Sequence, residues 1–542
     1  MSKQLLFITT LICIISVKAQ NISIETKLTA SDRAAVDNFG WSIDVDNNYA
    51  VIGAPFKNEF GSGGAVREDV GAVYIFETDN TGNWNEVNKI SASDAQIDDR
   101  FGWTVAVDGI YIVVGAPYED EDVNGMNTLN NAGAIYIYER DDTTGIWSEV
   151  QKIVASDRQE NDNFGYAVAI DDDFIAVGSF LEDEDGIGNN TIQDAGSVYM
   201  IKKGANGIWG ESQKIVASDR DFFNWFGEKV SISNDYLVVA AKEESEDAQG
   251  NNYLGEAGAA YIFHKDGSDN WSQTQKITAS DRSVFANFGT DVSIDGNFIA
   301  VGAILEGEDA LGQNTLTEAG AAYIFEKTNS GIWIQVDKLV PSDRNTGDEF
   351  GISVSIHGDH VIVGANREDE DENGGNTLNS SGSAYIYERD SFGSWNQIQK
   401  VVASDRSNVD NFGFDVSLSE EYAFIGANWE NEDENDTNSL SNSGSVYLVN
   451  RSPLLNVIEQ PDTESYFSLF PNPVKEQLFV EFENIQSKGT IKIYDLLGRE
   501  KYIKNYNNVK RMNITFEGVA GYYFVKIEDV NGAEIIKKFI KL

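Results

Sequence analysis

The sequence predicts an all-β protein, a seven-bladed β-propeller followed by a small C-terminal β-sandwich, from three observations. A Phe-Gly dipeptide recurs seven times at intervals of 62 or 63 residues, which marks one repeated structural unit. Each interval holds four segments with the alternation of apolar and polar residues that is typical of strands. Glycine is frequent (49) and proline scarce (7), which favours strands joined by Gly-rich turns. The dipeptides begin at Phe39, Phe101, Phe164, Phe226, Phe288, Phe350 and Phe412.

One unit illustrates the four strands. The residues from Phe164 alternate, an Asp-rich turn follows, and 174–178 is an almost unbroken apolar run, as expected of a buried strand. A long acidic loop occupies 181–194, a third strand contains Tyr199, and a fourth begins at Trp209. Four-stranded antiparallel units that repeat in this way are the blades of propellers.

The repeated elements do not occur equally often. The third-strand tyrosine occurs seven times, whereas the tryptophan that leads the fourth strand occurs only six times, from Trp84 to Trp395. Residues 21–29 match the end of a fourth strand. We therefore expect the N-terminal segment to complete the last blade, which closes the ring and removes its open edges.

The sequence also predicts the remaining boundaries. Residues 1–19 have the basic start and short apolar run of a secretory signal peptide, with cleavage between Ala19 and Gln20. The one cysteine, Cys13, lies inside that run, so disulfides and Cys-bound metals are not expected in the mature chain. The propeller then spans 20–452, a polar linker 453–466, and the C-terminal domain 467–542. We expect no transmembrane segment.

The formal net charge of -48 is unevenly distributed. Residues 467–542 carry +3, and the rest of the chain therefore carries -51. Such an acidic body would repel nucleic acid and anionic membrane surfaces, so we expect neither as a partner. It would attract cations, although high charge also serves solubility alone.

The motifs within the repeat resemble those of a known family. Phe-Gly, a strand pair and then Gly-Ala-Pro, intact at Gly53-Ala54-Pro55 and Gly115-Ala116-Pro117, is similar to the FG-GAP repeat of integrin alpha-subunit propellers, and most similar to its bacterial variety. The resemblance covers residues 21 to about 450 and implies a seven-bladed propeller. It implies much less about the ligand, because one fold serves many partners.

The C-terminal segment resembles a second family, the sorting domain of the type IX secretion system of Bacteroidetes. The shared features are Pro471-Asn472-Pro473, the turn from Asp495 to Arg499, the strand from Gly521 and the Lys-rich end. The resemblance implies that the type IX machinery is a partner. It also implies export to the cell surface or the medium, with removal of the tail; an ordinary accessory sandwich is the alternative.

The second turn of each unit predicts a metal site. In an antiparallel blade this turn and the link to the next blade share one face, which should therefore carry most of the acidic charge. Alternating oxygen side chains closed by a glycine resemble the start of a calcium loop. The candidate ligands are Asp120, Asp122, Asn124 and Thr128 in the second unit, Asp369, Asp371, Asn373 and Thr377 in the sixth, and Asp183 and Asp185 in the third. The alternative is a solvated acidic turn in which Asp and Asn serve turn geometry. Integrin calcium loops lie in a different turn, so their ligands are not carried over.

Two further groups of residues are candidates for contacts on this face. Ser-Asp-Arg precedes Phe-Gly in six of the seven units, and we expect each arginine to pair with neighbouring carboxylates. Trp225, Trp429, Phe222 and Phe223 are aromatic where other units are mostly polar, so they are candidate ligand contacts. Local loop packing is the alternative for these aromatics.

We predict a binding protein rather than an enzyme. The three histidines, His264, His357 and His360, belong to no motif, and the sequence has neither a phosphate loop nor a nucleophile elbow. The expected function is adhesion or recognition of an extracellular glycan or protein, with calcium as a possible stabiliser. A surface carbohydrate-active enzyme that uses carboxylates, and a structural component of the surface layer, are the alternatives.

Overall fold

The computed structural model describes residues 25–60, 66–79, 82–435, 438–451, 467–470, 474–475, 477–495, 500–516, 521–529 and 534–541. The predicted signal peptide with its cleavage at Ala19–Gln20, the linker 453–466 and the Pro471-Asn472-Pro473 motif lie outside these residues. The chain forms two compact units, Ile24–Ser452 and a second unit that contains Pro453–Leu542. No helix that could span a membrane occurs in the described part of the chain.

Seven four-stranded antiparallel sheets make up the first unit, and each sheet is one blade. Blade 1 is β2 (Ser42–Asp46), β3 (Tyr49–Ala54), β6 (Ala72–Thr78) and β7 (Trp84–Ile90), with a small ribbon of β4 (Glu59–Phe60) and β5 (Val66–Arg67) beside it. Blade 2 is β8 (Thr104–Asp108), β9 (Tyr111–Ala116), β10 (Ala134–Arg140) and β11 (Trp147–Ile153). Blade 3 is β12 (Ala167–Asp171), β13 (Phe174–Ser179), β14 (Ser197–Lys203) and β15 (Trp209–Ile215).

The other blades repeat this order. Blade 4 is β16 (Val230–Ser233), β17 (Tyr236–Ala241), β18 (Ala259–Lys265) and β19 (Trp271–Ile277). Blade 5 is β20 (Phe288–Asp295), β21 (Phe298–Ala303), β22 (Ala321–Lys327) and β23 (Trp333–Leu339). Blade 6 is β24 (Val354–His357), β25 (His360–Ala365), β26 (Ser383–Arg389) and β27 (Trp395–Val401), and blade 7 is β28 (Phe412–Leu418), β29 (Tyr422–Ala427), β30 (Ser445–Asn450) and β1 (Thr26–Leu28).

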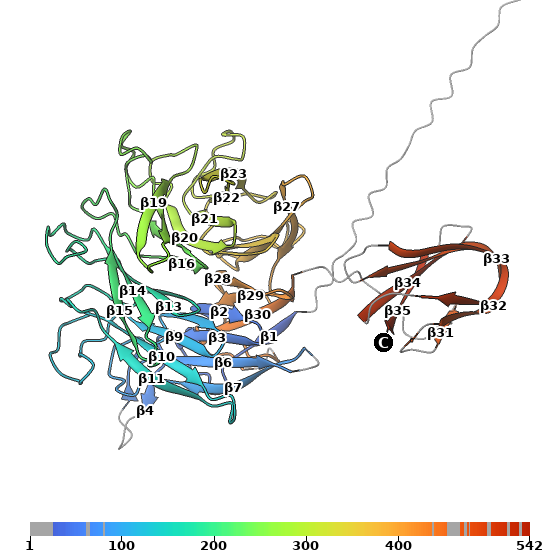
Figure 1. Ribbon diagram of the computed structural model, residues 1–542, viewed down its shortest axis with the longest axis horizontal. Coiled ribbons are helices and arrows are strands. Elements are labelled where there is room, and N and C mark those ends of the chain that lie inside the picture. Colours follow the sequence, from blue (N-terminus) through green and yellow to red (C-terminus); the bar gives the residue numbers. More distant parts are fainter. Residues whose placement is uncertain are drawn as a thin grey trace, which may run out of the picture. The chain divides into compact units, whose positions relative to one another are not determined.

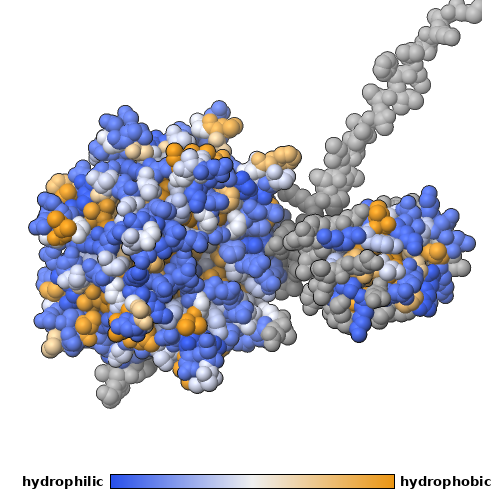
Figure 2. Space-filling view, viewed as in Figure 1, coloured by the Kyte–Doolittle hydropathy of each residue, from blue (hydrophilic) through white to orange (hydrophobic). Residues whose placement is uncertain are grey.

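The blades close into a ring around a central channel. The innermost strands contact one another in the order β2, β8, β12, β16, β20, β24, β28 and back to β2. In Figure 1 the blue β1 lies beside the orange β30, where the two ends of the propeller meet. The predicted all-β propeller with seven blades is thus confirmed. Hydrophilic residues cover most of the propeller face in view, and apolar residues form small separate patches (Figure 2).

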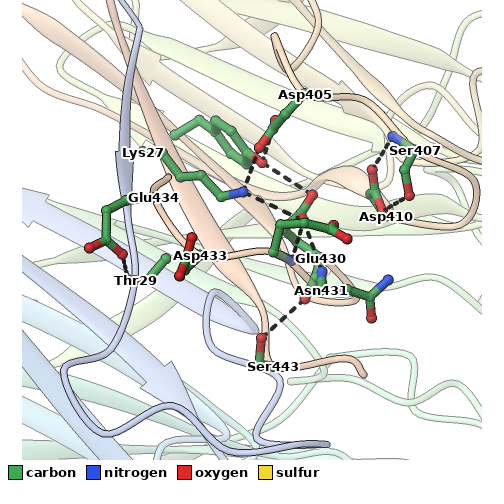
Figure 3. A network of polar contacts seen from close by, with 12 residues as sticks. Lys27, Thr29, Asp405, Ser407, Asp410, Glu430, Asn431, Asp433, Glu434 and Ser443 are labelled. Carbon is green, nitrogen blue, oxygen red and sulfur yellow. Dashed lines mark hydrogen bonds and ion pairs between the residues drawn. The ribbon is translucent and has the colours of Figure 1, made fainter. Parts of the chain in front are cut away.

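The N-terminal strand closes the ring as the count of tryptophans predicts. β1 pairs with β30, with Lys27 opposite Tyr447. The Lys27 Nζ lies 2.5 Å from Asp405 and 3.5 Å from Glu430, and Thr29 donates to Glu434 at 3.1 Å (Figure 3). Residues almost 380 positions apart in sequence therefore share one polar network.

Neighbouring blades meet through backbone contacts at the Phe-Gly dipeptides. The Phe101 N–H donates to the carbonyl of Val70 in the preceding blade, and the Phe101 ring is fully buried against Tyr136. Gly71 has φ +81°, and a Cβ there would lie 2.0 Å from the Phe101 carbonyl oxygen. The same approach joins Gly444 to Phe39 where the ring closes. Glycine is required because no side chain fits between the two backbones.

The innermost strands have one edge that no other strand covers. Side chains from the preceding blade supply acceptors for the N–H groups of that edge, because an unpaired buried N–H is costly. Asp44 Oδ2 accepts from Val107 N at 2.8 Å, and Asp415 Oδ2 accepts from Ile43 N at 2.6 Å. Serines do the same in the later blades, for example Ser355 with Leu418 N at 3.0 Å.

A repeated polar network lies beneath the long loops of the blades. In blade 2 the buried Tyr136 hydroxyl lies 2.8 Å from Asp94 and 2.9 Å from Glu119, and Lys152 Nζ is 2.7 Å and 3.1 Å from the same carboxylates. Burial and the two carboxylates raise the pKa of Tyr136 far above its usual value, so it stays a donor. The lysines neutralise part of the acidic charge.

Four blades add a second buried carboxyl group to this network. The pairs are Asp99 with Glu119, Asp162 with Glu182, Asp348 with Glu368, and Asp410 with Glu430. Burial and the charge of Glu182 raise the pKa of Asp162 to about 8, so the pair holds a proton at neutral pH. Blade 4 instead has Asn224, which donates to Glu244 at 2.6 Å.

The second unit is a small β domain, which confirms that the C-terminal segment is all-β. It is a five-stranded sheet of β31 (Phe467–Phe470), β32 (Gln477–Asp495), β33 (Glu500–Thr515), β34 (Gly521–Asp529) and β35 (Glu534–Lys541). The pairing of β32 with β33 shifts register between Glu481 and Gln486. Apolar residues on both sides of this shift, such as Leu478 and Ile493, belong to one core, so the long strands fold over a shared interior.

The blade contact predicts the effect of glycine substitutions. Gly133→Ala should destabilise the propeller by roughly 3 kcal/mol or more, because it combines a positive φ with severe backbone overlap. A Cβ at Gly133 would lie 2.1 Å from the Phe164 carbonyl oxygen. Gly210→Ala is the control, since nothing lies within 4 Å of a Cβ at that position. Urea unfolding measures both variants, and equal midpoints for the two would contradict the close packing.

The carboxyl pairs predict a pH dependence of stability. The folded pKa of Asp162, about 8, lies above its unfolded value. Its contribution to stability is therefore complete below about pH 4 and is lost as the pH rises through about 8. Asp162→Asn should reproduce the Asn224 arrangement and raise the free energy of unfolding at about pH 9 by roughly 1–3 kcal/mol, with little change at about pH 4.

Asn224→Asp provides the reciprocal variant. It should create a fifth carboxyl pair and lower stability mainly at high pH. Unfolding midpoints measured across this pH range for both variants test the role of the shared proton. A shift of the same size at every pH would show that the proton is not involved.

Candidate functional site

The central channel is the cavity around which the blades are arranged. Its volume is about 540 Å³, and the innermost strands of all seven blades line it. This volume lies within the range of ligand pockets, which combine apolar walls with a few polar groups. The walls of the channel differ from one side to the other.

Four aromatic residues line one side of the channel, and four more are joined to them by ring contacts; we call the eight together the aromatic rim. Most of its members follow Phe-Gly or the end of the second strand of a blade. Trp225 lies instead in the link before blade 4. They are Trp41, Phe56, Trp103, Tyr118, Tyr166, Phe180, Trp225 and Phe414. All eight are half-buried.

The rim is continuous from blade 7 through blades 1, 2 and 3. Trp41 lies 5.0 Å from Phe414 and 4.8 Å from Trp103 between ring centroids, and Trp103 lies 5.5 Å from Tyr166. Phe180 then connects Tyr166, at 4.3 Å, to Trp225, at 5.6 Å. Such rings offer flat apolar faces beside polar edges.

The opposite side has charged, hydroxyl and aliphatic groups in place of the aromatic ones. In blades 4, 5 and 6 the place of Trp41 is taken by Glu228, Thr290 and Ile352. Glu228 pairs with Lys242 at 2.6 Å. Lys229 lies 3.8 Å from Asp291, and its side chain is 43% exposed because it faces the channel.

Two channel carboxylates share one hydroxyl. The Ser353 hydroxyl lies 3.2 Å from Asp291 and 3.1 Å from Asp415. Burial raises the pKa of Asp415 to about 7, with Lys229 opposing the rise and Asp291 adding to it. Asp415 is therefore partly protonated at neutral pH and can either donate or accept a hydrogen bond.

The acidic second turns lie beside the blade links, as predicted. Backbone N–H groups of the link donate to the preceding loop, for example Asn161 N to the Asn130 carbonyl at 2.8 Å. The expected arginine–carboxylate pairs are wrong, however. Arg158 donates to the Asp120 carbonyl oxygen at 2.8 Å and to the Asn127 carbonyl oxygen at 3.2 Å. Arg220, Arg282, Arg344 and Arg406 repeat this pattern, because the curled loop directs its carbonyls toward the link.

The predicted calcium ligands lie in these loops and hold the loops' own backbone. Asp122 Oδ1 accepts from Asn124 N at 2.8 Å and Met126 N at 3.1 Å, and its Oδ2 accepts from the Asn127 amide. These hydrogen bonds lower the pKa of Asp122. Asp120 Oδ1 instead accepts from Asn131 N at 2.7 Å.

The other predicted loops have the same construction. Asp185 and Asp371 repeat the contacts of Asp122, while Asp183 and Asp369 repeat those of Asp120. Asn373 supplies a backbone N–H to its loop, and Asn124, Thr128 and Thr377 are exposed. Blade 5 forms the same turn around Asp309, although its sequence lacks the full motif. These hydrogen bonds agree with the alternative interpretation, in which the aspartates serve turn geometry.

Among the residues that the structure describes, two other groups of three carboxylates are close enough together to hold a cation: Asp108, Asp171 and Asp172, and Asp281, Glu306 and Glu308. Neither group contains a predicted calcium ligand. In the second group Lys338 Nζ lies 2.7 Å from Asp281 and 3.4 Å from Glu306, so a lysine already supplies a positive charge.

The four predicted aromatic contacts fall into two places. Trp225 belongs to the aromatic rim, and Trp429, 38% exposed, occupies in blade 7 the place of Phe56 and Tyr118. Phe222 and Phe223 are 62% and 47% exposed in the link before blade 4. The other rim residues were not predicted from the sequence, although the residue after each Phe-Gly is aromatic in blades 1, 2, 3 and 7.

Comparison with known proteins gives the family of each unit. A profile described as the FG-GAP repeat matches residues 23–76, 84–138, 147–201, 209–263, 271–325, 333–387 and 395–449. A profile described as the secretion system C-terminal sorting domain matches residues 468–542. No curated protein matches the chain.

Several solved structures have a similar arrangement at low similarity. One is a putative 6-phosphogluconolactonase from Bacteroides uniformis, with 12% identity and a TM-score of 0.43 over 67% of this chain and 85% of that chain. Another is a putative 6-phosphogluconolactonase from Bacteroides fragilis, with 12% identity and a TM-score of 0.41 over 68% of this chain and 85% of that chain. A third is Sqt1 of Saccharomyces cerevisiae, with 9% identity and a TM-score of 0.38 over 95% of this chain and 98% of that chain.

The sorting domain indicates that the protein is exported by the type IX machinery and is secreted or attached to the outer cell surface. The seven matches account for the seven blades, so the chain belongs to the FG-GAP repeat family of β-propellers and carries a type IX secretion sorting domain.

Proposed function

We propose that this exported propeller is a binding protein, not an enzyme, and that it recognises a glycan at the mouth of its central channel. The single observation that carries the proposal is the aromatic rim. Sugar rings stack on flat aromatic faces, and half-buried aromatic residues are common energetic centres of binding sites. The charged side opposite can fix the orientation of hydroxyl groups. A protein ligand is the alternative occupant.

The rim predicts which variant loses binding. Trp103→Ala should weaken binding of the glycan at least tenfold, because Trp103 touches four other rings of the rim. Phe392→Ala is the control, since Phe392 is 93% exposed in a third turn, at the other end of the blades. A glycan array followed by calorimetry measures both variants, and thermal melting checks that each is folded.

The outcomes separate the alternatives. Equal glycan binding by the two variants would remove the rim from the site. Binding of no glycan at all would refute glycan recognition and favour a protein ligand or a structural surface-layer component.

A second candidate function rests on the channel carboxylates. Asp291 and Asp415 face the channel, and the pKa of Asp415 near 7 suits a general acid. Both side chains already accept backbone N–H groups of the next blade, however, so their positions serve the ring. Release of shortened products from any bound glycan, abolished by Asp415→Asn, would establish hydrolysis and refute the binding-only proposal.

Calcium remains a proposed stabiliser of the acidic loops. An ion in blade 2 or 6 would share Asp122 or Asp371 with the N–H groups that these residues already hold. The proposal predicts a higher melting temperature in millimolar calcium, and a smaller rise in the double variant Asp122→Asn, Asp371→Asn. No change in melting would show that the loop hydrogen bonds suffice.

A further inference from the structure

Arg100 occupies an unusual place in the link between blades 1 and 2. The other six links contain Ser-Asp-Arg, whereas this link has Ala95 at the arginine position. An arginine is found instead directly before Phe101, in left-handed backbone conformation with φ 53°. The equivalent residue is asparagine in four other blades, namely Asn38, Asn163, Asn287 and Asn411. Asparagine tolerates this conformation, and arginine adopts it at a cost.

The Arg100 guanidinium stacks on the aromatic rim. Its central carbon lies 4.5 Å from the ring centroid of Tyr118, 5.1 Å from that of Phe56 and 6.0 Å from that of Trp103. Three rings therefore hold the planar group in one place, and one of them, Trp103, lines the channel.

Arg100 also lacks the partners that other arginines have. Its terminal guanidinium nitrogens form no hydrogen bond or ion pair with the residues that the structure describes. Within the described parts of 25–451, every other arginine donates to a carbonyl, a hydroxyl or a carboxylate. These are Arg33, Arg67, Arg140, Arg158, Arg220, Arg282, Arg344, Arg367, Arg389, Arg406 and Arg451.

Acidic residues lie near Arg100, yet its guanidinium pairs with none of those that the structure describes. The Arg100 N–H donates to the Asp69 carbonyl at 3.0 Å, and the Arg100 charge partly offsets the rise in the pKa of Asp69 that burial causes. Asp98 is two residues away in the same link. No described carboxylate comes within 4.0 Å of the guanidinium, so its donors stay available beside the rim.

We propose that Arg100 binds the carboxylate of a uronic acid residue in the glycan, whose sugar rings stack on the aromatic rim. This inference rests on the proposed function and names the class of its ligand. A planar guanidinium with free donors is suited to a carboxylate, which it can hold through two parallel hydrogen bonds. The charge of -51 outside the C-terminal domain opposes a polyanion, so the ligand has one acidic residue at this point rather than a charged repeat.

The test compares matched ligands and matched variants. The ligands are glucuronate- and galacturonate-terminated oligosaccharides, each beside its carboxyl-reduced counterpart. The variant is Arg100→Asn, which places at this position the residue that four other blades already have. Arg367→Asn is the control, because Arg367 stands in blade 6 at the place of Phe56 and is already paired with Glu349 at 2.6 Å.

The proposal expects the full protein to bind one acidic oligosaccharide at least tenfold more tightly than its reduced counterpart. Arg100→Asn should abolish this preference while keeping the weaker binding, and Arg367→Asn should keep the preference. Equal affinity for the acidic and reduced ligands, or a preference that survives in Arg100→Asn, would overturn the role of Arg100 and leave the rim proposal standing. If the protein binds no glycan, both proposals fall.

Discussion

The close approach of backbones between neighbouring blades is the constraint on which the rest of the structure depends. At all seven interfaces a Cβ on the glycine that starts the third strand would lie about 2 Å from the carbonyl oxygen of the next Phe-Gly. A shift of register would bring a side chain into this contact. The seven interfaces are equivalent and must close a ring, so the interval between dipeptides can vary little. This explains intervals of 62 or 63 residues throughout the propeller.

The acidic composition follows largely from the same scaffold. Asp44 and Asp415 accept N–H groups of the innermost strands, Asp122 holds its own loop, and Asp94 is shared by a tyrosine and a lysine. These carboxylates are repeated because the blades are repeated. The net charge is therefore a consequence of how the edges and turns are satisfied, and does not by itself indicate a bound cation.

The sequence predicts the fold better than the site. The count of seven dipeptides against six tryptophans was enough to place residues 26–28 in the last blade, because strand pairing requires a partner for every edge. The arginine contacts could not be predicted, since they depend on loop carbonyls whose directions follow from the curl of the turn. The rim was missed because its members lie about 60 residues apart and only the closed ring brings Phe414 beside Trp41.

The asymmetry of the channel is the strongest indication of where function lies. All seven blades pack against their neighbours through the same backbone contact. Glu228, Thr290 and Ile352 show that this packing does not need an aromatic residue after Phe-Gly. Trp41, Trp103, Tyr166 and Phe414 at this position are therefore not explained by the scaffold. Arg100 departs from the repeat beside one of these four residues, Trp103, in a backbone conformation that disfavours it. The aromatic residues after Phe-Gly and Arg100 thus depart from the repeat independently and lie on the same side of the channel. A ligand bound there would contact both the rings and the guanidinium.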